Sequence, residues 1–298
     1  MLNQNLNKNS IRNLLTIRYD PSERSLIPKA SYKNFNGVNT DADGLKTKKL
    51  LKNAFLKQIK EPRKPLAISL SSGIDSTLCL SLLRDTFPNS ELIGICGVFE
   101  NGFDESKQAS KIAKKFDAKF KTVKMPSIYQ TMPKLISITK KPKWNAYTHI
   151  IAQEAKKFSD YNVVGDGADE VFGGYNFRYN KFLSLVKPTS SPLDKIQAYL
   201  SCHERDWVPD QEKIFNSKTN FSWKSINSIF EPFFNNSLSP LNQVFLADYN
   251  GKLLYNFSII GNKINKFFNL KPVTPILNPK LISYASHIPS ELKYNPVK

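Results

Sequence analysis

The 298-residue sequence has few cysteines and no long apolar run, and each shortage excludes a class of protein. Its three cysteines are odd in number and widely spaced, so neither a disulfide framework nor a cysteine-based metal site is expected. No apolar stretch approaches the roughly 18 residues that a membrane-spanning helix needs. The first residues also lack the apolar core of a secretory signal. We therefore expect a cytoplasmic protein without a membrane segment.

Histidine is equally scarce. His149, His203 and His287 are isolated from one another and form no HxxxH or HExxH spacing. We interpret all three as structural residues.

Acidic residues are outnumbered by basic ones. The 43 lysines and arginines against 25 aspartates and glutamates give a formal net charge of +18. Such an excess is typical of nucleic-acid binding, but it also arises from lysine-rich helix faces in water. Because the sequence has no arginine-rich arm, aromatic RNA-binding signature or zinc finger, we favour solvated faces and keep nucleic acid as an alternative.

Hydrophobic residues make up 40% of the chain, enough for a core, and their pattern changes along it. A basic amphipathic helix is predicted where Leu51, Ala54 and Phe55 follow helical spacing. Further on, short apolar segments alternate with helical patterns. Strands are predicted at residues 66–70, 92–98, 120–123 and 161–164. This alternation predicts an α/β fold with a parallel sheet covered on both faces, whose ligands bind beyond the carboxyl ends of the strands.

A serine- and glycine-rich turn follows the first predicted strand, with the sequence Ser71-Ser72-Gly73-Ile74-Asp75-Ser76. Gly73 lets the backbone approach a ligand, and N–H groups at the start of the next helix attract phosphate. Serine hydroxyls add donors, and Asp75 can hold Mg²⁺ that bridges phosphates. No GxxxxGK[ST] sequence occurs, so this is not a Walker A loop. The alternative is that Ser72 and Asp75 only cap the helix.

A second glycine-rich turn follows the last of these strands and runs from Val164 to Tyr175. The residues of interest in it are three acids and two glycines: Asp166, Asp169, Glu170, Gly165 and Gly167. Clustered carboxylates repel one another unless a cation neutralises them, and Mg²⁺ takes a few carboxylates together with phosphate oxygens. The alternative is a favourable placement of acids in a helix first turn, which explains the acids but not the glycine pairs.

Together, the two turns resemble the synthetase domain of asparagine synthetases, which belong to the ATP pyrophosphatases. The family motifs read SGGxDS and SGEGADExFGGY, and here residues 71–76 read SSGIDS and residues 164–175 read VGDGADEVFGGY. Between them, Asp104-Glu105 also matches the family. The resemblance covers roughly residues 45–295. It implies an adenine nucleotide alpha hydrolase-like, PP-loop α/β domain with a mostly helical C-terminal extension.

That resemblance implies a division of the chain as well. Residues 1–45 form an N-terminal extension that is partly irregular, and residues 46–298 form the asparagine synthetase-like domain. Within it, residues 46–185 are the nucleotide-binding α/β part and residues 186–298 the helical part.

The activity implied by the resemblance is that of an AMP-forming carbon–nitrogen ligase. A substrate carboxylate, which is aspartate in asparagine synthetases, attacks the α-phosphate of Mg·ATP, and ammonia then displaces AMP to leave an amide. By motif position, the nucleotide is bound by Ser71, Ser72, Gly73, Ile74, Asp75, Ser76, Gly165 and Gly167. The catalytic residues are Asp75, Asp166, Asp169 and Glu170, and the Mg²⁺ ligands are Asp75 and Asp169.

Some positions of this sequence differ from the family pattern. These differences concern the acceptor substrate more than the binding of the nucleotide. Position 2 is leucine, where the family's glutaminase domain has its nucleophilic cysteine, and about 65 residues before the loop are too few for that domain. We expect no glutamine hydrolysis in cis, so ammonia is free, comes from a separate glutaminase partner, or is replaced by a substrate amine. Ser72 replaces a loop glycine and Asp166 a glutamate. Other differences fall at Lys141-Pro142, at Asn262-Lys263 and at residues 273–278.

Two alternatives to an aspartate-dependent ligase remain. One is a non-catalytic paralogue that keeps the nucleotide site. The other is an AMP-forming ligase with a different carboxylate or amine, or with an RNA substrate. RNA-modifying relatives do not typically carry GADExFGGY, which argues against the RNA substrate.

Overall fold

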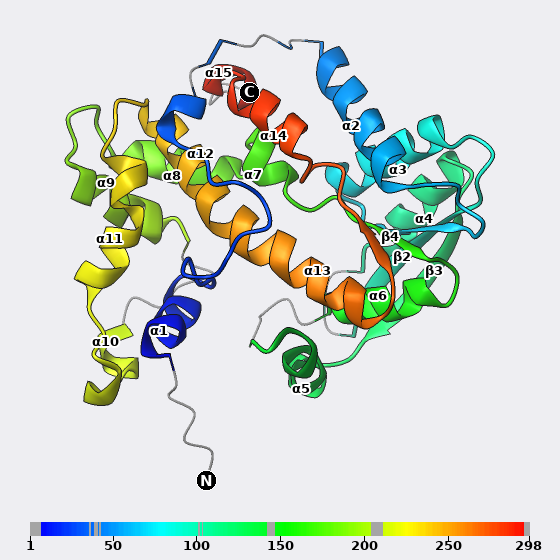
Figure 1. Cartoon of the computed structure of the whole chain (residues 1–298), viewed down its shortest axis with the longest axis horizontal. Helices are drawn as coiled ribbons and strands as arrows, with labels where there is room; N and C mark the ends of the chain where they lie inside the picture. Colours follow the sequence, from blue (N-terminus) through cyan, green and yellow to red (C-terminus); the bar gives the residue numbers. More distant parts are fainter. Residues whose placement is uncertain are drawn as a thin grey trace. The chain divides into compact units, whose positions relative to one another are not determined.

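The computed structural model describes residues 7–35, 37–38, 41, 43–100, 102, 104–141, 147–203 and 211–294, and these residues form two compact units (Figure 1). The sheet unit comprises Asp41–Ala168 and Ile259–Ile282. The helical unit comprises Met1–Thr40, Asp169–Ser258 and Ser283–Lys298. This division differs from the expected segments 1–45, 46–185 and 186–298. The N-terminal residues belong to the helical unit, and residues 259–282 return to the sheet unit.

The sheet unit is built on five parallel strands, of which the sequence predicted the first four. They are β1 Leu66–Ser69, β2 Leu92–Phe99, β3 Lys119–Met125, β4 Tyr161–Val163 and β5 Lys271–Val273, in the order β3-β2-β1-β4-β5. In register, Leu66 lies opposite Leu92, and Ala67 lies opposite both Ile93 and Asn162. From β1 the chain winds outward to β2 and β3, and β4 then pairs on the other side of β1. The switch point, where ligands bind in such sheets, is therefore between β1 and β4.

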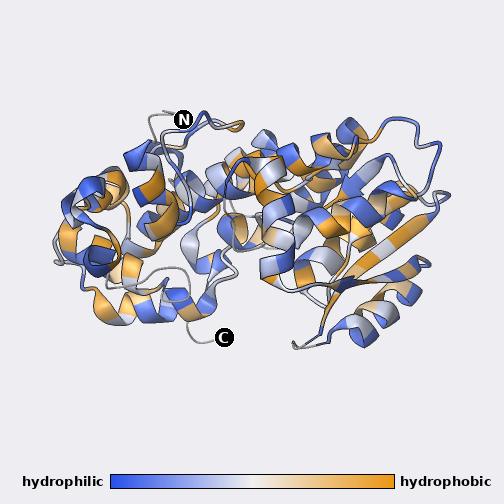
Figure 2. Cartoon of the chain, turned by 90° about the horizontal axis from the view of Figure 1, so that it is seen from below, coloured by the Kyte–Doolittle hydropathy of each residue, from blue (hydrophilic) through white to orange (hydrophobic). Residues whose placement is uncertain are grey.

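Helices cover this sheet. They are α2 Leu45–Gln58, α3 Ile74–Thr86, α4 Ser106–Lys115, α5 Ile128–Thr139, α6 Thr148–Lys156, α13 Ser258–Phe267 and the start of α14 Pro279–Ser286. One core joins Ala67 and Ile93 of the sheet to Ile151 of α6 and Ile264 of α13. In Figure 2 the strands are among the most hydrophobic segments of the unit. Burial of these apolar side chains drives the unit's folding.

The helical unit contains the remaining elements. They are α1 Lys8–Thr16, η1 Tyr32–Asn34, most of α7 Ala168–Phe172, α8 Asn176–Leu185, α9 Pro192–Ser201, α10 Gln211–Ile214, η2 Ser217–Thr219, α11 Trp223–Phe234, α12 Pro240–Asp248, the π-helical η3 Tyr249–Phe257, and α15 Ser290–Lys293. Aromatic rings fill the core, where Tyr199 lies 5.4 Å from Phe230 and 5.3 Å from Phe234 between ring centroids.

The N-terminal segment packs into this helical core. The ring of Tyr19 stacks on that of Tyr255 with centroids 5.8 Å apart. The Tyr249 hydroxyl donates a hydrogen bond to the Pro28 carbonyl at 2.6 Å. The described residues between positions 7 and 38 are therefore a structural part of the helical unit.

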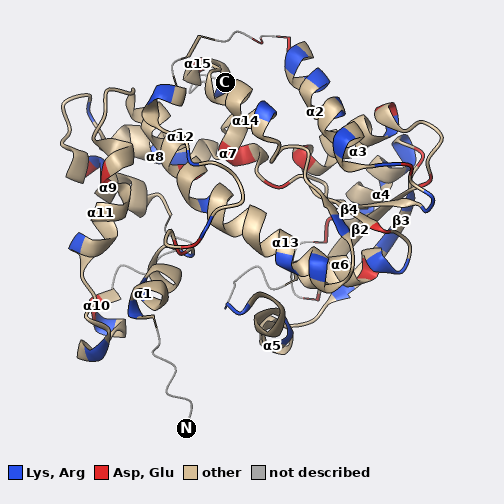
Figure 3. Cartoon of the chain, in the orientation of Figure 1, with Lys and Arg blue, Asp and Glu red and all other residues tan. Residues whose placement is uncertain are grey.

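Lys and Arg are spread over many elements in Figure 3, whereas α7 is marked by acidic residues. Among the residues that the structure describes, no helix combines the length and apolar character needed to cross a bilayer.

Candidate functional site

The turn after β1 is organised by its own serine side chains. The Ser76 Oγ accepts a hydrogen bond from the Ser71 N–H at 3.1 Å and lies 2.9 Å from the Ser71 Oγ. The Gly73 N–H in turn donates to the Ser71 Oγ at 3.1 Å. Helix α3 begins at Ile74 with Gly73 as its N-cap, a residue with no side chain to cap the first turn. The first-turn N–H groups thus stand at the positive end of a 13-residue helix, an arrangement that binds anions.

The geometry of this turn bears on the alternative that Ser72 and Asp75 only cap the helix. The N-cap is Gly73 rather than Ser72 or Asp75, so the prediction that those two residues cap the helix is wrong. The large apolar side chain of Ile74 is 82% exposed at the same place.

A carboxylate already occupies one anion position of the turn. The Ser72 N–H and the Ser72 Oγ both donate to Oε2 of Glu105, at 2.8 and 2.9 Å. A carboxylate oxygen and a phosphate oxygen are both negatively charged acceptors. Serine at position 72 therefore binds an anion in this structure.

The second turn approaches the first directly. A Cβ atom on Gly165 would lie 3.2 Å from the backbone carbon and oxygen of Asp75, tighter than an ordinary contact. Gly167 has a φ of +94°, in the region that favours glycine. Because β1 and β4 are neighbours, the two turns meet at the switch point of the sheet, as their positions after parallel strands predicted.

Acidic groups face one another where the turns meet. Desolvation raises the pKa of Asp166 to about 6, and the negative charge of Asp75 adds to the rise. The pKa of Tyr147 is also raised, first by desolvation and then by Asp166 and Glu105. The charges of Asp75 and Asp166 likewise add to the burial that raises the pKa of the Cys79 thiol to about 12.

These acids fit a magnesium ion. In the described part of the chain, no group of three or more histidine, cysteine or acidic side chains is arranged to hold a metal. Mg²⁺ bound with phosphates needs only one or two carboxylates, and Asp75 and Asp166 supply oxygen donors beside an anion-binding turn. The donor set is therefore suited to Mg²⁺ that arrives with a nucleotide.

Asp169 and Glu170 belong to the helical unit, where a glycine pair fixes Asp169. The Gly173 and Gly174 N–H groups donate to the Asp169 carbonyl at 2.9 and 3.1 Å. Gly173 has a φ of +82°, and a Cβ atom on Gly174 would overlap the Asp169 carboxylate. The glycines that the acid-placement alternative left unexplained thus bind the Asp169 carbonyl and leave space for its carboxylate.

Glu170 is buried, with 3% of its surface exposed. Burial raises its pKa to about 7, against the opposing effects of Tyr175 and Lys252. The Tyr175 hydroxyl donates to Glu170 Oε1 at 2.5 Å. Burial also raises the pKa of Asp169, opposed by Arg178 and Lys252. Glu170 therefore exchanges a proton near neutral pH.

Three cations near these acids were missed by the sequence reasoning. The Arg178 guanidinium lies 3.9 Å from the Tyr175 ring centroid, and the Lys252 ammonium lies 5.1 Å from the same centroid. Lys293 is half-buried beside the Phe245 ring, and desolvation lowers its pKa to about 7. Arg178 lies three residues beyond the second motif, but nothing in the sequence links Lys252 or Lys293 to it.

The predicted site residues therefore fall into two groups. Ser71 to Ser76, Gly165, Asp166 and Gly167 come together in the sheet unit. Asp169 and Glu170 lie in the helical unit. Lys263, which departs from the family, donates to the Thr139 carbonyl at 3.0 Å in the sheet unit. Trp144 and Pro142 lie outside the described residues.

The sequence of the chain is similar to that of known proteins. The asparagine synthase family model matches residues 46–298. Asparagine synthetase 1 (glutamine-hydrolyzing) of Bacillus subtilis (strain 168) is 26% identical over 298 aligned residues. The alignment covers 87% of this chain but 46% of that relative, so the chain spans about half its length.

Two solved structures give weaker matches. The NH3-dependent NAD synthetase from Campylobacter jejuni has a TM-score of 0.33 at 10% identity, over 67% of this chain and 99% of that one. The U34-tRNA thiolase NcsA from Methanococcus maripaludis has a TM-score of 0.35 at 15% identity, over 76% and 84%. Scores this low support no inference about activity.

Proposed function

The chain belongs to the asparagine synthase family, and we propose that it is an ATP-dependent ligase that adenylates a carboxylate and forms an amide with ammonia. The proposed carboxylate is that of aspartate, and the products besides the amide are AMP and pyrophosphate. The observation that carries the proposal is the Ser72 turn, which holds a carboxylate oxygen through N–H and Oγ at the start of α3.

In this proposal the turn after β1 binds the pyrophosphate portion of ATP. A phosphate oxygen takes the place of Glu105 Oε2 at Ser72, and the first-turn N–H groups of α3 bind further oxygens. The exposed Ile74 side chain supplies an apolar contact for the nucleotide. Gly165 lets the second turn lie against the backbone of Asp75, and by motif position Gly165 and Gly167 contact the nucleotide.

Asp75 is the proposed Mg²⁺ ligand, with Asp166 beside it in the sheet unit. Bound Mg²⁺ supplies charge neutralisation for the phosphate oxygens and orients them. The raised pKa of Asp166 reflects desolvation and the charge of Asp75, and a cation at this place would remove that repulsion.

The proposed chemistry has two balanced steps. First, an oxygen of the substrate carboxylate attacks the α-phosphorus of ATP, the bond from that phosphorus to the bridging oxygen breaks, and pyrophosphate leaves with the electron pair. Second, ammonia attacks the activated carbonyl carbon, the carbon–oxygen bond to AMP breaks, and the nitrogen loses a proton. Glu170, with a pKa near 7, is the proposed acceptor of that proton.

The test compares two aspartates of the same helix. Asp75 lies in the first turn of α3, whereas Asp85, near its other end, forms exposed ion pairs with Lys52 and Lys48 at 3.2 and 3.5 Å. The native chain is incubated with Mg·ATP, aspartate and ammonium, and AMP and pyrophosphate are followed by chromatography. We expect Asp75→Asn to lower the rate at least 100-fold, because a carboxylate beside the phosphates is lost, and Asp85→Asn to retain it.

Full activity in Asp75→Asn would remove Asp75 from the mechanism. AMP formation with another carboxylate would keep the chemistry and change the substrate. Nucleotide binding without cleavage by the native chain would identify a non-catalytic module instead.

A further inference from the structure

Glu105 reaches the turn after β1 from a different segment of the sheet unit. It is the N-cap residue of α4, and it comes close to Ser72 because β1 and β2 are neighbouring parallel strands whose following segments lie side by side. The Ser72 N–H and Oγ donate to the same oxygen of its carboxylate, Oε2, at 2.8 and 2.9 Å. Hydrogen bonds to an ionised group are roughly twice as strong as those between neutral groups, so this contact ties the two segments together.

The start of α4 does not use the Glu105 side chain. Within the described part of the chain, that side chain makes no capping hydrogen bond to its own helix. Asp104 serves the first turn instead, since its Oδ1 accepts from the Ser106 N–H at 2.9 Å. The Glu105 carboxylate therefore serves the turn after β1 rather than helix α4.

Serine at position 72 strengthens the contact. The family motif has glycine at this position, and glycine would offer the N–H but not the Oγ. Ser72 thus gives the Glu105 carboxylate a second donor. The pair of hydrogen bonds depends on a residue that departs from the family pattern.

The charge of Glu105 acts on other groups of the sheet unit. Desolvation and then the charge of Glu105 raise the pKa of the Cys96 thiol to about 11. Glu105 also contributes to the raised pKa of Tyr147, after desolvation and Asp166. Both shifts have the sign expected of a nearby ionised carboxylate. A phosphate group that approaches Ser72 meets the same negative charge.

We propose that Glu105 is an internal competitor of the nucleotide: its carboxylate holds the anion position at Ser72, and a polyphosphate binds by displacing it. This inference rests on the proposed function, because it concerns the same turn. A triphosphate offsets the two lost hydrogen bonds with bonds to several first-turn N–H groups of α3, whereas a small monovalent anion gains fewer. The contact lowers the apparent affinity for the nucleotide in proportion to the fraction of molecules whose turn is open.

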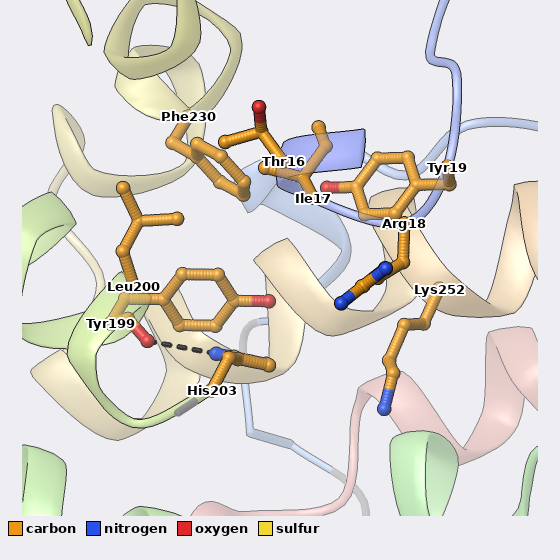
Figure 4. Close-up of a pocket in the computed structure, with 9 residues that line it drawn as sticks. All are labelled: Thr16, Ile17, Arg18, Tyr19, Tyr199, Leu200, His203, Phe230 and Lys252. Carbon is orange, nitrogen blue, oxygen red and sulfur yellow. Dashed lines mark hydrogen bonds between the residues drawn. The ribbon is translucent and has the colours of Figure 1, made fainter. Parts of the chain in front are cut away.

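A recess in the helical unit is too small to bind the same ligands. It is lined by the segment Thr16–Tyr19, by Tyr199 and Leu200 of α9, by Phe230 of α11 and by Lys252 of η3, among others (Figure 4). Its volume is about 30 Å³, which is room for about two water molecules at roughly 10–15 Å³ each. A triphosphate used as a probe therefore does not report on this recess.

The test measures the binding of inorganic triphosphate and of ATP to the native chain and to Glu105→Gln by calorimetry at constant ionic strength. Glutamine keeps the length of the side chain and removes its charge, and thermal unfolding checks that the variant is folded. We expect Glu105→Gln to bind triphosphate at least about fivefold more tightly than the native chain, because a charged competitor is lost. The gain should appear with and without Mg²⁺. If Glu105 were a metal ligand, the variant would bind more weakly when Mg²⁺ is present.

Glu100→Gln is the matched control. Glu100 directly follows β2, is exposed, and forms an ion pair with Lys124 at 3.2 Å. Its replacement changes the net charge by the same amount without removing the contact to Ser72. Triphosphate binding by this variant should stay within about twofold of the native value, since exposed ion pairs contribute little.

A double-mutant cycle tests the part played by the Ser72 hydroxyl. Ser72→Gly removes a donor from the nucleotide site in either background, but in the native chain it also weakens the Glu105 contact. The substitution should therefore weaken triphosphate binding at least about threefold more in the Glu105→Gln background than in the native chain. Additive effects would show that the hydroxyl does not hold Glu105 and would contradict the proposed contact.

Weaker or unchanged triphosphate binding by Glu105→Gln would overturn the proposal and leave the proposed ligase activity standing. A different result would refute the proposed nucleotide site itself, and with it this inference: neither triphosphate nor ATP binds to the native chain or to the folded Glu105→Gln variant.

Discussion

At the scale of single residues, buried acids distinguish this protein's second motif from an ordinary acidic helix start. Burial raises the pKa of Glu170 to about 7 and desolvation raises that of Asp166 to about 6. Solvated carboxylates have pKa values near 4. Such groups exchange protons at physiological pH, which suits a base that must act on an attacking amine.

The raised pKa of Glu170 predicts a pH-dependent stability. Because the folded state holds the proton more tightly than the unfolded state, this contribution is fully present below about pH 4 and is lost as the pH rises through 7. We expect Glu170→Gln, whose amide oxygen still accepts from Tyr175, to lose this dependence. Between pH 5 and 8 its free energy of unfolding should fall by about 1–2 kcal/mol less than that of the native chain.

Urea unfolding at several pH values measures the difference. Glu231→Gln, at an exposed position in the same unit, should follow the native curve. Parallel curves for the native chain and Glu170→Gln would mean that Glu170 is ionised throughout.

Sequence reasoning identified the residues of the two turns because each turn is a continuous segment. Their partners come from elsewhere in the chain. Glu105 reaches Ser72 across 33 positions, and Lys252 acts on Glu170 across more than eighty. Glu105 was noticed through the family resemblance, but its bond to Ser72 depends on how the loop before α4 lies against the turn after β1, which no local pattern encodes.

At the scale of elements, the predicted strands and helices from residue 45 to 163 are confirmed because each carries a clear apolar period. Leu51, Ala54 and Phe55 are buried on α2 as predicted. β5 was missed because it has three residues, one of them Pro272, and shows no alternation. Its position is set by parallel pairing with β4.

The turn between α7 and α8 gives a testable prediction about one glycine. Gly174→Ala should displace the Asp169 carboxylate, because the added Cβ atom would occupy its place, and should lower both stability and AMP formation. We expect a loss of about 1–3 kcal/mol in the free energy of unfolding. Denaturant titration and the AMP assay measure the two effects.

Gly261→Ala is the matched control. A Cβ atom there meets nothing within 4 Å, and the position lies inside α13. Alanine should therefore leave stability unchanged or raise it by about 0.5–1 kcal/mol. If Gly174→Ala behaved like Gly261→Ala, the turn would not be holding Asp169.

At the scale of the whole molecule, each compact unit is made of segments that are separated in the sequence. The sequence suggested an irregular extension followed by one continuous domain. In the structure the N-terminal segment completes the helical core through contacts more than 200 positions away in the sequence. Asn250 is the main example, since its side chain accepts from the Ala30 N–H at 3.1 Å and donates to the Ala30 carbonyl at 3.0 Å.

Asn250→Ala should therefore release the N-terminal segment from the helical unit. We expect a loss of about 1–3 kcal/mol in the free energy of unfolding, because the partly buried N–H and carbonyl of Ala30 are left unpaired. Cleavage near residues 22–32 should also become faster in limited proteolysis. Asn235→Ala, at an exposed position, should change neither measurement. An unchanged cleavage rate in Asn250→Ala would show that other contacts hold the segment.

The central claim is that a carboxylate oxygen of the substrate attacks the α-phosphorus of ATP. It is tested most directly with aspartate labelled with ¹⁸O in its side-chain carboxylate, incubated with the native chain, Mg·ATP and ammonium. Mass spectrometry of the nucleotide products then follows the label. We predict AMP that carries one ¹⁸O atom, formed in step with asparagine and pyrophosphate. Label in inorganic phosphate together with ADP would show attack at the γ-phosphorus and contradict the proposed adenylation.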